Sequence, residues 1–233
     1  QSKLAKMEDK KYFSRQIDES LMAWKNSTRH KPLLLRGARQ VGKSSSVRHL
    51  AKQFDYFVEI NFERKPAYLE IFKGDRDAKH IVEMIKSITG EPIVPGKTLL
   101  FFDEIQMCQE AISSLRFFWE DMPGLHVIAA GSLLEFALSE IPTFGVGRIH
   151  SMFMYPMSFD EFLNALGMFS LQKYKREASP EKPLLSALHE QLVSLFRTYL
   201  MVGGMPESVS TWVDTHSYVA VSYTHLRAHE TKA

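Results

Sequence analysis

The sequence of 233 residues holds a single cysteine, Cys108, and no long hydrophobic run. One cysteine excludes an intramolecular disulfide, so a reducing, cytoplasmic setting is the simplest expectation. The longest apolar stretches, near residues 99–102 and 127–130, are far shorter than the roughly 20 residues that cross a bilayer. No secretory signal is visible. These absences argue against a disulfide-stabilised secreted protein and against a membrane protein.

A strong charge of one sign is also missing. The 29 Lys and Arg residues nearly balance the 27 Asp and Glu residues, which gives a formal net charge of +2. Such a balance neither demands nor excludes nucleic acid, because a basic patch can lie on a nearly neutral protein. The apolar content of 45% is ordinary for a globular core. The length allows one large domain, or one domain and part of another.

The most informative stretch is residues 33–45, with the sequence LLLRGARQVGKSS. It matches the pattern G-x-x-x-x-G-K-[ST] completely, between a short apolar strand and a helical pattern. In such a loop, backbone N–H groups and the positive end of the helix dipole face phosphates. We therefore predict a phosphate-binding loop, which consists of Gly37, Ala38, Arg39, Gln40, Val41, Gly42, Lys43, Ser44 and Ser45.

Three side chains of this loop have separate expected roles. Lys43 would reach the β- and γ-phosphates, and the Ser44 hydroxyl would be a ligand of Mg²⁺. Arg39 is expected to point away from the phosphates. An ordinary glycine turn is the alternative interpretation, and the strand before the loop and the helix after it make that alternative the weaker one.

A second stretch, LLFFDE at residues 99–104, places two acids at the end of an apolar strand. Ligands of open α/β sheets bind at the carboxyl ends of the strands. Asp103 would hold Mg²⁺ through its water shell, and Glu104 would orient and deprotonate the attacking water. A strand that ends in acids is common on its own, but here it follows a complete phosphate loop by about 60 residues.

Two more residues are candidates with open alternatives. Ser132 follows the next apolar strand, where its hydroxyl could sense the γ-phosphate or cap a helix that passes through Phe136. Arg148 is the best candidate for a cation that neutralises transition-state charge, from within the chain or across a contact. A solvated arginine at a strand edge is the alternative for Arg148.

Strands alternate with helices along the chain, which predicts a three-layer α/β domain of the P-loop NTPase class with a parallel five-stranded sheet. A helical segment at residues 1–30 precedes this domain, which spans residues 31–168, and residues 66–89 look helical. Ser158 and Glu161 form a capping box that opens a short helix. The predicted strands are 33–35, 56–61, 98–102, 126–130 and 148–155.

The remainder of the chain is predicted to be partly helical. Residues 170–183 are charged and contain two prolines, so a linker or crossing loop is expected there. A helix over 184–201 should end at Gly203 and Gly204, and Pro206 should start another. Residues 184–220 would thus begin a C-terminal helical domain. The tail 221–233, VSYTHLRAHETKA, looks like a translated sequencing-adapter read-through and is expected to be non-native and to bury little.

Several stretches together resemble one family, the prokaryotic AAA-type ATPases whose conserved C-terminal region is a domain of unknown function. The resemblance covers about residues 15–215, and its combination of motifs is more specific than each motif alone. The matching stretches are KPLLLRGARQVGKSS, TLLFFDEIQ, AAGSLLE, GRIHSMFMYPMSFDEFL and YLMVGGMPE.

This resemblance implies ATP and Mg²⁺ binding by the phosphate loop and the acid pair. The family usually carries threonines after the lysine, and Ser44 and Ser45 retain the hydroxyl here. Family members continue beyond the motif at residues 203–207, so this chain is expected to lack most of the C-terminal domain. A protein or DNA partner could act through that region.

Three functions fit the sequence. The favoured one is Mg²⁺-dependent ATP hydrolysis coupled to a conformational change of the C-terminal region. A phosphotransferase is less favoured, because no arginine cluster suited to a basic lid is present. The third is a nucleotide-gated binding or regulatory module that acts on a protein or DNA partner with little turnover. GTP is less favoured than ATP, because the sequence contains no N-K-x-D-like segment.

Overall fold

The computed structural model describes residues 11–74, 77–132, 134 and 147–230, which form two compact units. Within these ranges the first unit contains Ile17–Met154, and the second contains residues 11–16 and 155–230. The two units divide between residues 154 and 155, and the predicted end of the ATPase domain at residue 168 stays a prediction. Among the described residues, no helix is long and apolar enough to cross a membrane.

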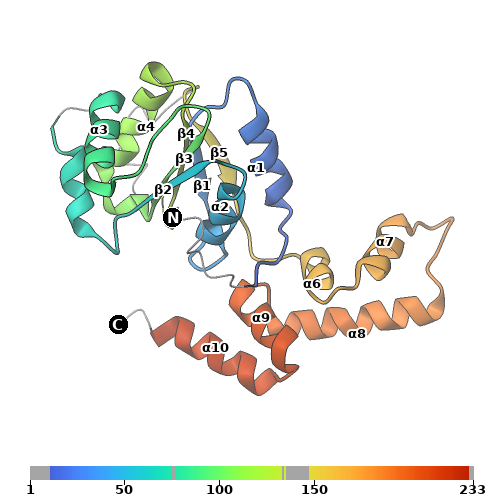
Figure 1. Cartoon of the computed structure of the whole chain (residues 1–233). Coiled ribbons are helices and arrows are strands. Elements are labelled where there is room, and N and C mark those ends of the chain that lie inside the picture. The colour runs from blue at the N-terminus through green and yellow to red at the C-terminus, as the bar shows by residue number, and fades with distance from the viewer. Residues whose placement is uncertain (1–10, 75–76, 133, 135–146, 231–233) are drawn as a thin grey trace. The chain divides into compact units, whose positions relative to one another are not determined.

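The first unit is built on a parallel five-stranded sheet with the order β2-β3-β4-β1-β5 (Figure 1). This confirms the predicted fold class and all five predicted strands. The last strand is shorter than expected, because only four residues pair with β1. The strands are β1 (Leu33–Arg36), β2 (Tyr56–Asn61), β3 (Thr98–Asp103), β4 (His126–Ala130) and β5 (His150–Phe153).

Helices cover both faces of this sheet, because successive strand residues point to opposite sides and both sets are apolar. Leu34, Ile60 and Phe102 belong to the set that packs with η2, α3 and α4. On the other face α2 contacts β3 and β4, and α1 packs on α2. The helices are α1 (Ile17–Asn26), α2 (Lys43–Ala51), the 3-10 helix η2 (Pro66–Phe72), α3 (Ala78–Thr89), the 3-10 helix η3 (Ile105–Met107) and α4 (Gln109–Asp121).

The helical stretch expected over 66–89 is divided into η2 and α3. Pro66 begins η2, where its missing N–H is not needed. The Asp77 side chain accepts a hydrogen bond of 2.9 Å from the Lys79 backbone N–H and so starts a separate helix. A local cap therefore begins a new helix inside the predicted one.

The second unit is helical. Ser158 and Glu161 form the predicted capping box, with hydrogen bonds of 3.2 and 2.7 Å. Gly203, at φ 76°, ends α8, and Pro206 begins α9, as the sequence predicted. The helices are α6 (Phe159–Ala165), α7 (Phe169–Glu177), α8 (Ser186–Val202), α9 (Pro206–Thr215) and α10 (Tyr218–Glu230).

The linker expected over residues 170–183 is wrong for its first half, which is helix α7. Leu171 of α7 is buried in a cluster with Leu163 and Leu192. Lys175 lies on the polar side of α7 and forms an ion pair of 2.8 Å with Asp160. The charged residues therefore lie on one face of an amphipathic helix and do not indicate a linker.

The expectation that the tail buries little is also wrong. Val221 of α10 is 2% exposed and packs with Val202 and Val209. The His225 Nε2 atom lies 3.2 Å from both the Ser208 hydroxyl and the Val202 carbonyl oxygen. The resemblance of residues 221–233 to an adapter read-through stays a prediction, but the first part of the tail packs in the second unit.

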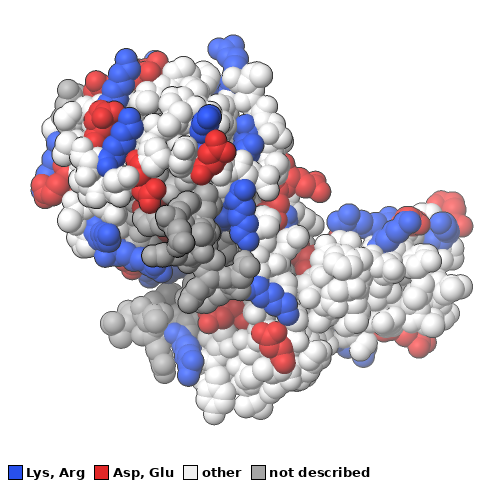
Figure 2. All heavy atoms as spheres, in the orientation of Figure 1, with Lys and Arg blue, Asp and Glu red and all other residues white. Residues whose placement is uncertain are grey.

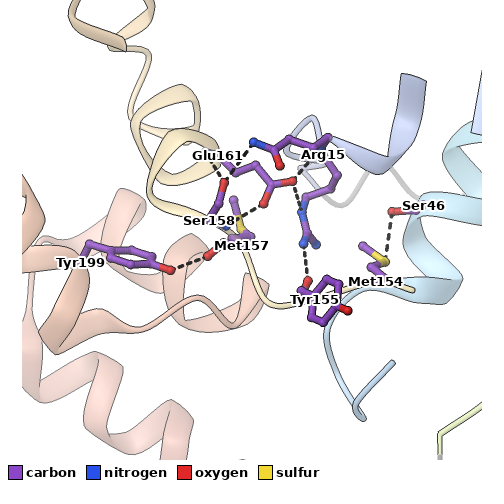
Figure 3. Close-up of polar contacts among 9 residues, drawn as sticks. Arg15, Ser46, Met154, Tyr155, Met157, Ser158, Glu161 and Tyr199 are labelled. Carbon is purple, nitrogen blue, oxygen red and sulfur yellow. Dashed lines mark hydrogen bonds and ion pairs between the residues drawn. The ribbon is translucent and has the colours of Figure 1, made fainter. Parts of the chain in front are cut away.

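A buried ion pair fixes the segment before α1 within the second unit (Figure 3). Arg15 Nε lies 3.0 Å from Glu161 Oε1, and the two side chains are 5% and 7% exposed. The same carboxylate oxygen accepts a hydrogen bond of 2.7 Å from the Gln16 backbone N–H. Such a pair is costly to break, because removing one partner leaves a buried charge.

At the opposite edge of the sheet from the predicted site, His126 begins β4 and stacks on His30, with ring centroids 3.6 Å apart. The His126 Nε2 atom lies 3.0 Å from the Lys25 carbonyl oxygen. Burial, opposed only in part by that hydrogen bond, lowers the pKa of His126 from 6.5 to about 4. His126 is therefore neutral when it packs against His30.

We predict that the first unit loses stability as the pH falls from about 6.5 to about 4. In that window His126 is protonated in the unfolded chain but stays neutral in the folded one. The full pKa difference corresponds to a loss of about 3 kcal/mol in the free energy of unfolding. Urea unfolding across this window should show a shallower pH dependence for His126→Gln than for His80→Gln, which changes an exposed histidine of α3. Equal slopes for the two variants would contradict the prediction.

Candidate active site

The predicted phosphate loop connects β1 to α2 at the carboxyl edge of the sheet. Gly37 and Gly42 have φ values of 144° and 99°, a region that favours glycine. A Cβ atom at Gly37 would overlap the carbonyl oxygen of Met154, which follows β5. The Gly42 carbonyl accepts the first helical hydrogen bond of α2, 2.9 Å from the Ser46 nitrogen. Both glycines are therefore required by the backbone of the loop.

Lys43 places its charge inside this loop. Its side chain is buried, and Nζ donates to the carbonyl oxygens of Gly37 and Ala38 at 2.9 and 2.8 Å. Burial lowers the pKa of Lys43, and the nearby carboxylates of Glu104 and Asp103 oppose that effect. The structure therefore brings the loop lysine and the acid pair into one site. Arg39, by contrast, forms an exposed ion pair of 3.0 Å with Glu63.

Ser44 and Asp103 meet directly, although β4 lies between β1 and β3 in the sheet. The Ser44 hydroxyl donates to Asp103 Oδ1 at 2.9 Å, and Asn61 Nδ2 donates to Oδ2 at 2.9 Å. Burial raises the pKa of Asp103, while the Ser44 hydrogen bond lowers it. Burial is therefore the largest effect on the pKa of this carboxylate.

This pair of oxygens fits a magnesium ion. Mg²⁺ prefers hydroxyl and carboxylate oxygens and usually takes only one or two protein ligands beside water and phosphate. A cation near Ser44 and Asp103 would also offset the burial of the carboxylate. In the described part of the chain no group of three or more His, Cys, Asp or Glu could hold a metal.

Sequence reasoning missed the residues behind Asp103. Arg48 of α2 binds Glu59 of β2 with two hydrogen bonds of 2.6 and 3.1 Å, and its Nη2 lies 3.8 Å from Asp103 Oδ2. Asn61, the last residue of β2, is paired in register with Asp103. The position of Asn61 at a strand end could have marked it as a candidate site residue. Its contact with Asp103 could be predicted only if β2 and β3 were known to be neighbours in the sheet.

Glu104 leaves the strand in a left-handed conformation, with φ 53°. Such a conformation is uncommon for a residue other than glycine and costs about 1–3 kcal/mol. Its backbone N–H donates to Asp103 Oδ1 at 3.2 Å, and its Oε2 accepts from Gln106 Nε2 at 2.6 Å. The strained turn and the two hydrogen bonds hold the carboxylate beside the phosphate loop.

Ser132 lies at the same edge of the sheet, two residues after β4, and is 6% exposed. Because β4 lies between β1 and β3, this residue is placed between the phosphate loop and the acid pair. The helix through Phe136 that it was expected to cap lies outside the described residues. Its assignment as a γ-phosphate contact stays a proposal.

Arg148 does not reach the phosphate loop of its own chain. It precedes β5, which runs parallel to β1 with His150 beside Leu33, so it lies at the amino edge of the sheet. There its Nε forms an ion pair of 2.8 Å with Glu120. This placement agrees with the alternative of an exposed arginine at a strand edge. It does not support an Arg148 cation that acts on the site from within the chain, and a role across a contact between chains stays a prediction.

Comparisons with known proteins agree with this geometry. A family model described as "AAA domain" matches residues 29–163. The Walker-type ATPase PABY2304 of Pyrococcus abyssi superposes with a TM-score of 0.55 at 18% identity, over 94% of this chain and 73% of that chain. PCH-2 of C. elegans gives a TM-score of 0.54 at 13% identity, over 95% and 72%. These likenesses show a shared fold. No curated protein matches in sequence.

We predict that Asp103→Asn weakens ATP binding by about 10-fold with Mg²⁺ present and changes it little in chelator, because the substitution removes a charge that favours the metal. Titration of a fluorescent ATP analogue with and without EDTA measures this. Asp55→Asn, at an exposed surface ion pair, is the matched control. A loss of equal size in EDTA would assign Asp103 a structural role instead.

Proposed function

The chain belongs to the AAA domain family of ATP-binding ATPases, and we propose that its site hydrolyses ATP with Mg²⁺ and passes the nucleotide state to the helical second unit. The observation that carries the proposal is the 2.9 Å hydrogen bond between Ser44 and Asp103. It joins the phosphate loop to the acid pair, so one site holds the groups that phosphoryl transfer to water needs.

Each residue has a defined task in this proposal. The N–H groups of the loop and the Lys43 ammonium bind the β- and γ-phosphates. Ser44 and Asp103 would hold Mg²⁺, which neutralises charge on the phosphate oxygens when bound. The Glu104 carboxylate orients a water molecule and accepts its proton as the oxygen attacks the γ-phosphorus, whose bond to the bridging oxygen breaks so that ADP leaves. Ser132 contacts the γ-phosphate from the end of β4.

The coupling proposal rests first on Met154, the last residue of the first unit. Its backbone N–H donates to the Arg36 carbonyl at 2.8 Å, and its carbonyl fills the space left by the missing side chain of Gly37. Its sulfur lies 3.9 Å from the Ser46 hydroxyl (Figure 3). Met154 therefore lies directly against the phosphate loop, so a change in that loop is expected to move it.

The chain enters the second unit at the next residue, and hydrogen bonds hold it there. The Tyr155 carbonyl accepts from Arg15 Nη2 at 2.7 Å. Met157 donates its N–H to the Gly204 carbonyl at 2.6 Å and accepts at its own carbonyl from the Tyr199 hydroxyl at 2.7 Å. A short covalent connection thus joins the phosphate loop to the helix ends of the second unit, which supports coupling.

Hydrolysis is tested with Glu104→Gln. This variant should bind ATP like the parent but release phosphate at least about 10²-fold more slowly, because general-base contributions are of that order. Lys43→Ala should lose binding altogether, and Glu83→Gln, an exposed residue of α3, is the control. Turnover by Glu104→Gln equal to that of the parent would place the base elsewhere.

Coupling is tested by hydrogen exchange. MgATP should change the protection of residues 155–163 and 186–215, and Tyr199→Phe should reduce the change in 186–215 without altering ATP affinity, because it removes the bond to Met157. Tyr174→Phe, at an exposed tyrosine of α7, should behave like the parent. If MgATP leaves exchange in the second unit unchanged in the parent, the coupling proposal is wrong.

The second candidate function is a nucleotide-gated binding module for a protein or DNA partner. It would be favoured if the parent bound MgATP but hydrolysed it no faster than Glu104→Gln. On the face of the molecule shown in Figure 2, Lys and Arg side chains are interspersed with Asp and Glu. This face has no continuous basic field of the kind that DNA backbones require, so it lends no support to a DNA partner.

A further inference from the structure

We infer that Gln106 is a positioning residue for Glu104, and that glycine at position 131 is what allows Gln106 to take this place. The inference rests on the proposed function, in which Glu104 is the general base. It concerns two residues to which the sequence assigned no role, and it explains how a half-buried carboxylate on a strained turn keeps one orientation.

The first observation is the contact to the base. Gln106 Nε2 donates to Glu104 Oε2 at 2.6 Å, which is a short, charge-assisted hydrogen bond. The orientation of the amide is fixed by chemistry, because a flipped amide would turn its oxygen toward the carboxylate. The bond uses Oε2 of Glu104, so Oε1 is the oxygen that would accept the proton.

The second observation is the other end of the same amide. Gln106 Oε1 is buried and accepts no hydrogen bond from the part of the chain that the structure describes. A buried, unpaired acceptor costs about 1–3 kcal/mol. The amide oxygen is therefore a cost to the fold, and a buried acceptor of this kind needs an explanation.

The third observation is the close approach of Gly131. A Cβ atom at this position would overlap Gln106 Oε1 and would lie 3.3 Å from Leu134 side-chain atoms. Gly131 follows β4, the strand next to β3. The backbone at the end of β4 therefore forms the wall against which the amide packs, and the packed amide in turn fixes the direction of the Glu104 carboxylate.

A small displacement of a catalytic group is enough to slow a reaction markedly, since near-attack geometry is lost. Gln106→Met keeps the size of the side chain and removes the hydrogen bond. We expect it to lower kcat by about 10-fold while KM and the Kd for MgATP change less than twofold. Gln53→Met, which makes the same change at an exposed turn, is the matched control.

Two double-mutant comparisons separate positioning from general structure. If Gln106 acts through Glu104, then Gln106→Met should have no further effect on the residual rate of Glu104→Gln. If Gly131 acts through Gln106, then Gly131→Ala should lower kcat in the parent but not in Gln106→Ala, where the overlapping atom is gone. Unfolding midpoints of all variants show whether each is folded.

The outcomes distinguish this inference from the proposed function. A normal rate for Glu104→Gln would show that Glu104 is not the base in the proposed function, and the inference would fail with that assignment. A slow Glu104→Gln together with a normal Gln106→Met, or with additive losses in the Gln106 and Glu104 pair, would overturn the inference alone. Should Gly131→Ala fail to fold, the Gln106 and Glu104 comparison still decides.

Discussion

The site depends on the register of the parallel sheet at its carboxyl edge. Asn61 pairs with Asp103, Asp103 with Ala130, and Ala130 with Leu35, so the ends of four strands lie in one row. Neighbouring strands are about 4.8 Å apart, and this spacing sets the distance from the phosphate loop to the acid pair. A slip of one residue would turn Asp103 to the other face and break its bond to Ser44.

The sequence predicted those features that depend on neighbours along the chain. Apolar runs located the five strands, and glycine spacing located the loop between Gly37 and Ser45. The bond of Asn61 to Asp103 and the pair of Arg48 with Glu59 depend on strand order, which no local pattern encodes. The hydrogen bond from Gln106 to Glu104 joins residues only two apart in the sequence. It forms with Glu104 in the left-handed conformation, which the residue type of a glutamate does not predict.

Two of the wrong predictions share a physical cause: each judged a segment or residue by its type without its placement. Charge in residues 170–183 was taken as a sign of a linker, but Leu171 supplies the buried face of a helix. Arg148 was chosen because it is a cation near a strand, but it lies at the amino end of that strand. In a parallel sheet the phosphates can bind at only one edge, so the strand end matters more than the residue.

Two glycines at this edge of the sheet leave room for groups that link the site to neighbouring segments. Gly37 makes room for the Met154 carbonyl, from which the chain leads into the second unit, and Gly131 makes room for the Gln106 amide, which holds Glu104. Any side chain at either position must displace its neighbour. In the proposed function, the loop glycine therefore serves both nucleotide binding and the connection to the second unit, whereas the glycine after β4 serves the positioning of Glu104. In this proposal binding, hydrolysis and coupling depend on different side chains, so variants at Lys43, Glu104 and Tyr199 test the three separately.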